Sequence, residues 1–117
     1  MPQEITVDQH GVRLAAWHLT ATSDALNRPT GRPCVVMAHG FGATRDSGLL
    51  PFAERFAAAG TDAVIVDYRG FGASEGEPRQ HVDHRAHRED YHAAIARARA
   101  LDGVDPERIV QIGRAHV

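Results

Sequence analysis

The chain has 117 residues, a formal net charge of −2 and 43% hydrophobic residues, which suits one domain with a modest core. This balance gives no electrostatic case for a nucleic-acid or membrane partner, and no apolar run approaches the roughly 20 residues that span a bilayer. One cysteine, Cys34, excludes an internal disulfide, and the N-terminal stretch lacks the features of a signal peptide. We therefore expect a cytoplasmic protein, whose oligomeric state the sequence does not indicate.

The first predicted element is a β-hairpin over residues 4–19, in which EITVD and VRLAAWHL flank a turn containing Gly11. Residues 23–33 are rich in Pro, Gly, Asn and Asp and are predicted to form a loop. The apolar run CVVMA, 34–38, lacks polar alternation and therefore predicts a strand buried on both faces.

A helix is predicted next, because apolar residues recur at helical spacing, Pro51 suits a first turn and Gly60 suits the position after the last. AVIVD, 63–67, predicts a second buried strand. A second helix over about 83–101 and a third strand, RIVQI at 108–112, follow. The expected apolar positions are Leu49, Phe52, Phe56 and Ala59 in the first helix, and Tyr91, Ala94, Ile95, Ala98 and Leu101 in the second.

A hairpin followed by β-α-β-α-β is typical of the α/β class, with a mostly parallel sheet and helices on both faces. Ligands of such sheets bind beyond the carboxyl ends of the strands. Two loops are expected at that edge: HGFGATRD after the first parallel strand and YRGFGASEGEPR after the second. The sequence therefore directs the search for a site to these loops.

The two loops and their order resemble a known family. HGFG follows a strand at residue 39, and after a helix and a strand the chain reads DYRGFGAS from Asp67. From about Pro33 to Gln111 this pattern resembles the N-terminal half of α/β-hydrolases of the serine aminopeptidase and lysophospholipase-like group. The resemblance implies hydrolysis of an ester, thioester, lactone or amide bond of a small-molecule acyl substrate through an acyl-enzyme, without a cofactor.

By this resemblance, the backbone N–H of Phe41 is one donor of an oxyanion hole, which stabilises the charge that develops on the attacked carbonyl oxygen. Gly40 and Gly42 would shape the turn that begins at His39, because glycine lets the backbone approach the substrate closely. The alternatives are a glycine-rich turn without a role in binding, or a phosphate loop. A dinucleotide fingerprint does not fit, since the third glycine is replaced by Arg45.

GASEG, 72–76, spells the G-x-S-x-G of a nucleophile elbow. An elbow needs a strand running directly into its first glycine and a helix starting directly after its serine. Here the predicted strand AVIVD ends several residues before Gly72, and the residues after Gly76, EPRQ, do not resemble a helix start. We therefore interpret Ser74 as part of a structural loop, in which Asp67 and Arg69 are expected to pair.

Four histidines at and near the start of the second helix suggest a metal site, but no Cys or carboxylate stands at a recognisable ligand spacing with them. We expect no metal there and interpret the cluster as a solvated or partly packed helix start. Cys34 lies within a strand and is expected to be a small buried hydrophobe. The histidines are His81, His84, His87 and His92.

The third strand should run into the nucleophile elbow, yet the chain continues as IGRAHV and holds no serine after Ser74. The six residues 112–117 match the translation of a common sequencing-adapter stretch, ATCGGAAGAGCACACGTC, which is followed there by a stop codon. We expect them to be non-native and residues 1–117 to form one partial domain without the nucleophile, acid and histidine. Such a chain is predicted to be poorly soluble, because RIVQI would be an open edge strand, and inactive as an esterase.

Three other interpretations remain open at this point. The chain could be a non-catalytic α/β module that binds a small ligand in the same crevice, or a nucleotide- or NAD-binding domain. It could also belong to a non-hydrolytic enzyme on the same fold, such as a transferase or haloperoxidase. The acyl group, the leaving group and any cap domain are not indicated by these residues.

Overall fold

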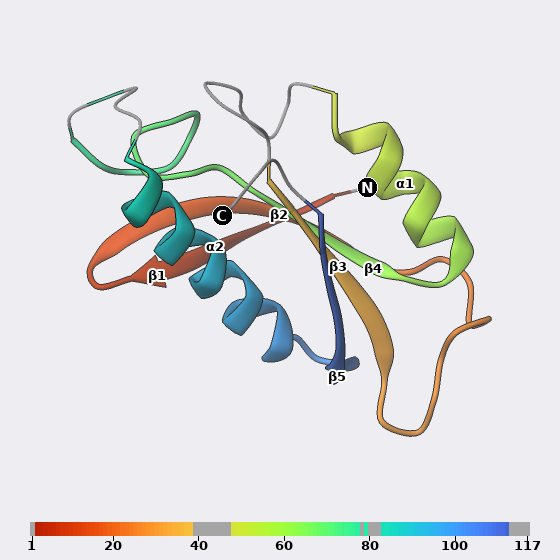
Figure 1. The fold of residues 1–117 in the computed structure, drawn as a ribbon. Helices are drawn as coiled ribbons and strands as arrows, with labels where there is room; N and C mark the ends of the chain where they lie inside the picture. Colours follow the sequence, from red (N-terminus) through yellow and green to blue (C-terminus); the bar gives the residue numbers. More distant parts are fainter. Residues whose placement is uncertain (1, 39–47, 78, 80–82, 113–117) are drawn as a thin grey trace.

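The computed structural model describes residues 2–38, 48–77, 79 and 83–112. In this part of the chain a five-stranded sheet of order β1-β2-β4-β3-β5 carries one helix on each face (Figure 1). The elements in chain order are β1 (Gln3–Gln9), β2 (Val12–Leu19), β3 (Arg32–Ala38), α1 (Leu50–Ala59), β4 (Asp62–Val66), α2 (His84–Arg99) and β5 (Val104–Ile112). The expected α/β class, a hairpin followed by β-α-β-α-β, is confirmed.

The hairpin closes through a two-residue turn. Gln9 pairs with Val12 across antiparallel strands, and the intervening His10 and Gly11 have φ angles of 49° and 85°. Positive φ at both central residues gives the type I′ turn, whose twist matches that of the two strands. Strand β2 then continues the sheet by pairing antiparallel with β4.

Strands β3, β4 and β5 form the parallel part of the sheet, with β3 between the other two. All residues of β4 are buried, as are those of β3 from Cys34 to Ala38. Alternate residues face two separate cores: Val36 packs on the side of α2, whereas Val35 and Met37 pack on the side of α1. Both faces of these strands are therefore apolar, which explains the unbroken hydrophobic runs.

Strand β5 begins at Val104, four residues earlier than expected. Val104 pairs with Arg32, and Ile109 pairs with Cys34, so the strand has a bulge that contains Pro106. A bulge tolerates a residue that lacks an amide hydrogen. In the described sheet β5 is an edge strand, and its Val110 is 55% exposed.

Helix α1 starts with Pro51 in its first turn and ends at Gly60, which has the left-handed φ of 106° expected of a helix terminator. The predicted apolar stripe was wrong at Phe52, which is 61% exposed, and at Ala59, which is also exposed. It is confirmed at Leu49 and Phe56, which are partly buried against the core on this side of the sheet. Ala53 and Ala57 are the fully buried residues of the helix.

Helix α2 begins after Asp83, whose carboxylate accepts the Ala86 N–H at 3.1 Å and caps the first turn. The predicted apolar stripe is confirmed: Tyr91, Ala94 and Ala98 are buried in the core between α2 and the sheet. Neither helix in the described ranges is long and apolar enough to cross a membrane.

Candidate functional site

The carboxyl ends of β3, β4 and β5 lie at one edge of the sheet, where the sequence placed the site. Because β3 and β5 are parallel neighbours with Met37 opposite Ile112, the carboxyl end of β3 lies beside that of β5 (Figure 1). The oxyanion assignment to Phe41 stays a prediction, since the motif lies outside the described residues. That motif comprises His39, Gly40, Phe41 and Gly42.

Ser74 lies within the loop that follows β4 and is only 2% exposed. Its hydroxyl donates to the Asp67 carbonyl oxygen at 2.7 Å and accepts the Ala15 N–H of β2 at 2.8 Å. The hydroxyl proton is therefore engaged by the backbone, whereas a nucleophilic serine presents its hydroxyl to a base and to the substrate. This geometry supports the interpretation of Ser74 as a structural residue that ties the loop to the hairpin.

Asp67 occupies the centre of the same loop and is 2% exposed. Its carboxylate accepts the Ala73 N–H at 3.2 Å. Gly72 has a φ of +55°, and a Cβ at that position would collide with the Asp67 carboxylate. The glycine is therefore required by the close approach of the loop backbone to this buried carboxylate.

Arg79 closes the loop from its far end. Its Nη1 donates to the carbonyl oxygens of Ser74 at 2.7 Å and Gly76 at 3.3 Å, and its Nη2 donates to that of Gly72 at 3.0 Å. One guanidinium thus satisfies three carbonyls of the GASEG string. The string forms a closed loop held by its own hydrogen bonds, unlike the strand-to-helix turn of an elbow.

The expected pairing of Arg69 with Asp67 is wrong. The Arg69 guanidinium pairs with Asp90 of α2, at 2.7 Å from Nη2 and 2.9 Å from Nε to Oδ1, and the Arg69 N–H donates to Oδ2 at 2.9 Å. Asp90 is fully buried. A buried carboxylate needs cationic and hydrogen-bonding partners, and Arg69 supplies both across a separation of 21 residues.

Sequence reasoning missed Asp90, although a signal was present. Asp90 lies three residues after His87 and four before Ala94, both of which are buried on the inner side of α2. An acidic residue on the apolar stripe of a helix predicts a partner within the fold, because an unpaired buried carboxylate is costly. Arg69 was the nearby cation in the loop that such reasoning could have selected.

His87 packs among aromatic rings at the same edge. Its imidazole stacks on Tyr68 with ring centroids 4.5 Å apart and meets the edge of Phe71 at 5.5 Å. The ring is 8% exposed, and its Nε2 has no hydrogen-bond partner. Burial lowers the pKa of His87, so the neutral imidazole is favoured in the folded protein.

Tyr91 lies one residue after Asp90 and is 3% exposed. Its hydroxyl donates to the Val36 carbonyl oxygen of β3 at 2.7 Å and is also within hydrogen-bond distance of the Ile112 carbonyl oxygen of β5. Burial raises the pKa of the phenol. The tyrosine therefore connects α2 to two adjacent strands near the carboxyl ends of both.

No group of three or more His, Cys, Asp or Glu that could hold a metal ion occurs among the described residues, a search that leaves out His81. Cys34 is fully buried, as expected, and burial together with the nearby Asp62 raises the pKa of its thiol to about 12. The thiol is therefore inert at neutral pH.

The opposite edge of the sheet holds a second buried carboxylate. Asp62 accepts hydrogen bonds from His18 Nε2 at 2.8 Å, from Arg32 Nε at 2.7 Å and from the Ala21 N–H at 2.9 Å. Burial alone would raise the pKa of Asp62, but these hydrogen bonds outweigh it and hold the pKa at about 2. The three side chains lock the starts of β3 and β4 to the end of β2.

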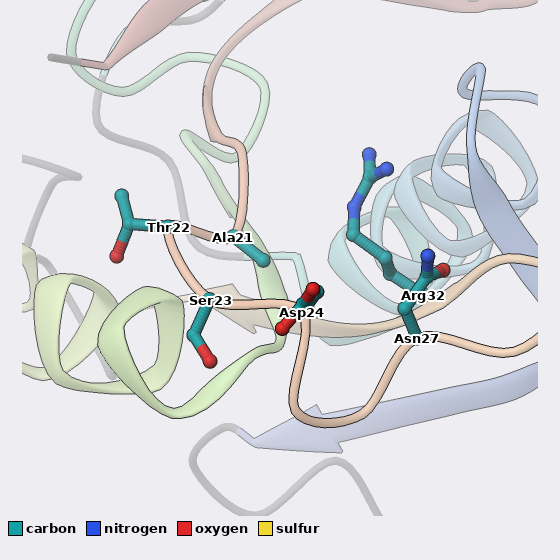
Figure 2. A pocket seen from close by; sticks show the side chains of 6 residues that line it. All are labelled: Ala21, Thr22, Ser23, Asp24, Asn27 and Arg32. Atoms are coloured by element: carbon teal, nitrogen blue, oxygen red, sulfur yellow. The ribbon is translucent and has the colours of Figure 1, made fainter.

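Beside this lock the surface is hollowed where the chain passes from β2 to β3 (Figure 2). The Arg32 side chain lines the hollow, but its guanidinium is committed to Asp62. The hollow also lies at the amino ends of the parallel strands, away from the loops expected to carry the chemistry. Its lining residues are Ala21, Thr22, Ser23, Asp24, Asn27 and Arg32.

Residues 29–111 match the sequence profile of the family described as serine aminopeptidase, S33. The chain is 42% identical over 120 residues to the quorum-quenching protein AidA of Acinetobacter baumannii, and this match covers 99% of the chain and 38% of AidA. It is 43% identical over 77 residues to the thiohydrolase aneE of Aspergillus aculeatus, covering 66% of the chain and 24% of that protein.

Solved structures give the same picture. The α/β-hydrolase GrgF from a Penicillium species superposes with a TM-score of 0.84 at 28% identity, covering 97% of this chain and 37% of GrgF. The hypothetical protein PA2218 from Pseudomonas aeruginosa superposes with a TM-score of 0.85 at 27% identity, covering 97% of this chain and 35% of that one. The chain thus spans less than two fifths of the length of each of these similar proteins.

Proposed function

The chain belongs to the serine aminopeptidase (S33) family of α/β-hydrolases, and on that basis we propose that it is the N-terminal part of a serine hydrolase. The complete protein cleaves an ester, thioester, lactone or amide bond of a small acyl substrate through an acyl-enzyme. The nucleophile, acid and histidine are contributed by the sequence that follows Gln111 in the complete gene. The reaction requires no cofactor and takes place in the cytoplasm.

One observation carries the proposal. β3 and β5 are adjacent and parallel, so the strand end that precedes the HGFG motif and the end of β5 lie side by side. In α/β-hydrolases one oxyanion donor comes from the loop after the former strand and the other from the residue after the nucleophile. The strand order of this chain therefore supports a site in which both donors converge on one carbonyl oxygen.

In the proposed reaction the nucleophilic hydroxyl, deprotonated by the histidine, attacks the carbonyl carbon of the substrate. The Phe41 N–H donates to the oxygen as negative charge develops there. The leaving group departs with a proton from the histidine, and water then releases the acid from the acyl-enzyme. The ring of Phe41 would lie near the acyl pocket.

The experiment starts from the source locus, which is sequenced past the codon for Gln111. The complete reading frame is then expressed and tested with a fluorophosphonate probe and with p-nitrophenyl esters, a thioester, a lactone and an anilide. Covalent labelling and hydrolysis of at least one substrate class are expected. A reading frame that stops after Val117 in genomic DNA, or a complete protein that neither labels nor hydrolyses, would contradict the proposal.

The role of Phe41 has a matched pair of variants. Phe41→Pro removes the backbone N–H and is expected to lower kcat about 10² to 10³-fold, as the loss of one oxyanion donor does. Phe41→Ala keeps the N–H and is expected to retain most of kcat while changing KM for different acyl lengths. Equal loss of kcat in both variants would contradict the backbone role.

Acyl transfer to an acceptor other than water is a second candidate. It is favoured by similarity to proteins named as transferases, including the polyketide transferase ATR5 of Stachybotrys chlorohalonatus, at 38% identity over 81 residues, covering 69% of the chain and 27% of that protein. Product analysis with a thioester in the presence of alcohols and amines distinguishes the two. Free acid as the sole product supports hydrolysis, whereas a new ester or amide supports transfer.

A further inference from the structure

Tyr91 links two strands through their backbones. Its single hydroxyl lies 2.7 Å from the Val36 carbonyl oxygen and also contacts the Ile112 carbonyl oxygen. A phenol has one proton, so the two carbonyls share it in a three-centre hydrogen bond. Because both acceptors are backbone atoms, the contact does not depend on which side chain stands at position 112.

The two carbonyls mark the ends of strands with separate roles in the proposed site. Val36 lies two residues before the end of β3, from which the HGFG motif departs, and Ile112 ends β5, after which the nucleophile is expected. We propose that Tyr91 is a positioning residue, whose hydroxyl fixes the spacing between the strand ends that carry the two halves of the oxyanion hole. The inference rests on the proposed function.

The surroundings of Tyr91 make it suited to this task. The preceding residue, Asp90, binds the guanidinium and the N–H of Arg69, in the loop three residues after the end of β4. Two consecutive residues of α2 therefore contact the ends of β3 and β5 and the loop that follows β4. The Tyr91 ring also packs edge-on against Tyr68, with centroids 6.5 Å apart, so the phenol has little freedom to move.

Loss of the Tyr91 hydroxyl is expected to lower the catalytic rate, because catalysis is sensitive to the positions of the reacting groups. Without the hydroxyl, the Val36 and Ile112 carbonyls lose a common donor and the two strand ends can separate. Misplacement of reacting groups by about 1 Å can cost on the order of 100-fold in rate. Binding of substrate depends less on this spacing, so the loss is expected in kcat rather than in KM.

The first test uses the 117-residue chain and amide hydrogen exchange, which does not depend on activity. In Tyr91→Phe, exchange is expected to rise roughly fivefold to tenfold at residues 36–38 and 110–112, as loss of about one hydrogen bond predicts. Exchange at residues 3–9 and at the amino end of β3 should not change. Tyr68→Phe is the control, since it removes the hydroxyl of the neighbouring ring.

The second test uses the complete protein from the source locus. Tyr91→Phe is expected to lower kcat roughly 10 to 100-fold with KM within about twofold, whereas Tyr68→Phe should affect kcat much less. An active protein with unchanged kcat in Tyr91→Phe would overturn the inference and leave the proposed function intact.

The inference would also be overturned if amide exchange in Tyr91→Phe were unchanged, or if it rose equally over the whole sheet. An equal rise in Tyr91→Phe and Tyr68→Phe would overturn it as well. A complete protein that is inactive with Tyr91 in place would overturn the proposed function, and exchange alone would then decide whether Tyr91 holds the strand ends.

Discussion

The amino ends and the carboxyl ends of the parallel strands lie at two opposite edges of the sheet, and the buried carboxylates at these two edges have different partners. Each holds a fully buried aspartate paired with an arginine: Asp62 with Arg32 at the amino ends of the parallel strands, and Asp90 with Arg69 at the carboxyl ends. At the amino edge a histidine, His18, also contacts the carboxylate and completes the set of partners. At the amino edge, these contacts of Asp62 connect strands to one another.

At the carboxyl edge the nearby histidine is not part of the ion pair. His87 packs between aromatic rings and keeps an unpartnered Nε2, while Asp90 connects a helix to a loop. The amino edge is therefore a closed polar lock, whereas the carboxyl edge joins the elements that would surround a substrate. We therefore expect loss of the carboxylate at the amino edge to destabilise the fold more, and the predictions below test that expectation.

The largest effect is expected from Asp62→Ala. The change leaves the buried His18 imidazole and the partly exposed Arg32 guanidinium without their common partner, which costs about 3 to 5 kcal/mol for a broken buried pair. Urea unfolding followed by circular dichroism measures this loss. Asp24→Ala, at an exposed position of the adjoining loop, is the control and should change the free energy of unfolding very little.

A smaller loss is expected from Asp90→Asn. The amide keeps the shape of the carboxylate but removes its charge, and Arg69 is partly exposed, so water screens part of the interaction. The free energy of unfolding should fall by about 2 kcal/mol. Glu89→Gln makes the same chemical change one residue earlier, at an exposed position. If Asp90→Asn destabilised the chain more than Asp62→Ala, the contrast between the two edges would be wrong.

The two edges should also differ in their response to pH. Burial lowers the pKa of His87 and outweighs the opposing effects of Asp90, of a hydrogen bond to the Arg69 backbone and of Asp83. His87 therefore binds a proton more readily in the unfolded chain than in the folded chain. The free energy of unfolding consequently falls as the pH drops below about 6.5. Asp62 has a folded pKa of about 2, below its ordinary value, so its contribution is lost only as the pH falls from about 4 toward 2.

Unfolding midpoints in urea between pH 8 and pH 3 would separate these two windows. His87→Gln should remove the loss of stability below pH 6.5 and retain the loss near pH 3. A His87 imidazole that titrates at or above its ordinary pKa by NMR would contradict the assignment of the upper window.

The smallest effect is expected from Arg13→Ala. The ion pair of Arg13 with Glu75 lies on the surface, with side chains 65% and 48% exposed, and solvent screens it. The Arg13 backbone still donates to the Glu75 carboxylate and accepts the Glu75 N–H after the change. No resolvable change in the unfolding midpoint is expected, and a clear loss would show that the charge itself holds the loop.

Much of the fold was predictable because single segments carried unambiguous patterns. The buried runs CVVMA and AVIVD and the apolar stripe of α2 each follow from local spacing, and all are confirmed. The start of β5 was missed because its bulge depends on the pairing with β3, which local sequence does not encode. Phe52 and Ala59 were wrongly placed on the buried face because helical spacing alone does not tell which side of a helix meets the sheet.

The candidate site was less predictable for a related reason. Arg69 was assigned to the nearest acid along the chain, Asp67, whereas its partner is Asp90 on another element. Partner choice among buried charges depends on three-dimensional proximity, and the hydroxyl of Tyr91 shows the same limit. The family resemblance identified the loops, but only the strand order shows that β3 and β5 end side by side.

The burial of Cys34 has a practical consequence for biophysical work. The chain holds this one cysteine, and its thiol is fully buried with a pKa of about 12. Thiol-directed dyes and spin labels require a thiolate and access to it. A cysteine introduced at an exposed position such as Glu54 could therefore be tagged selectively in the folded protein, without first removing the native one.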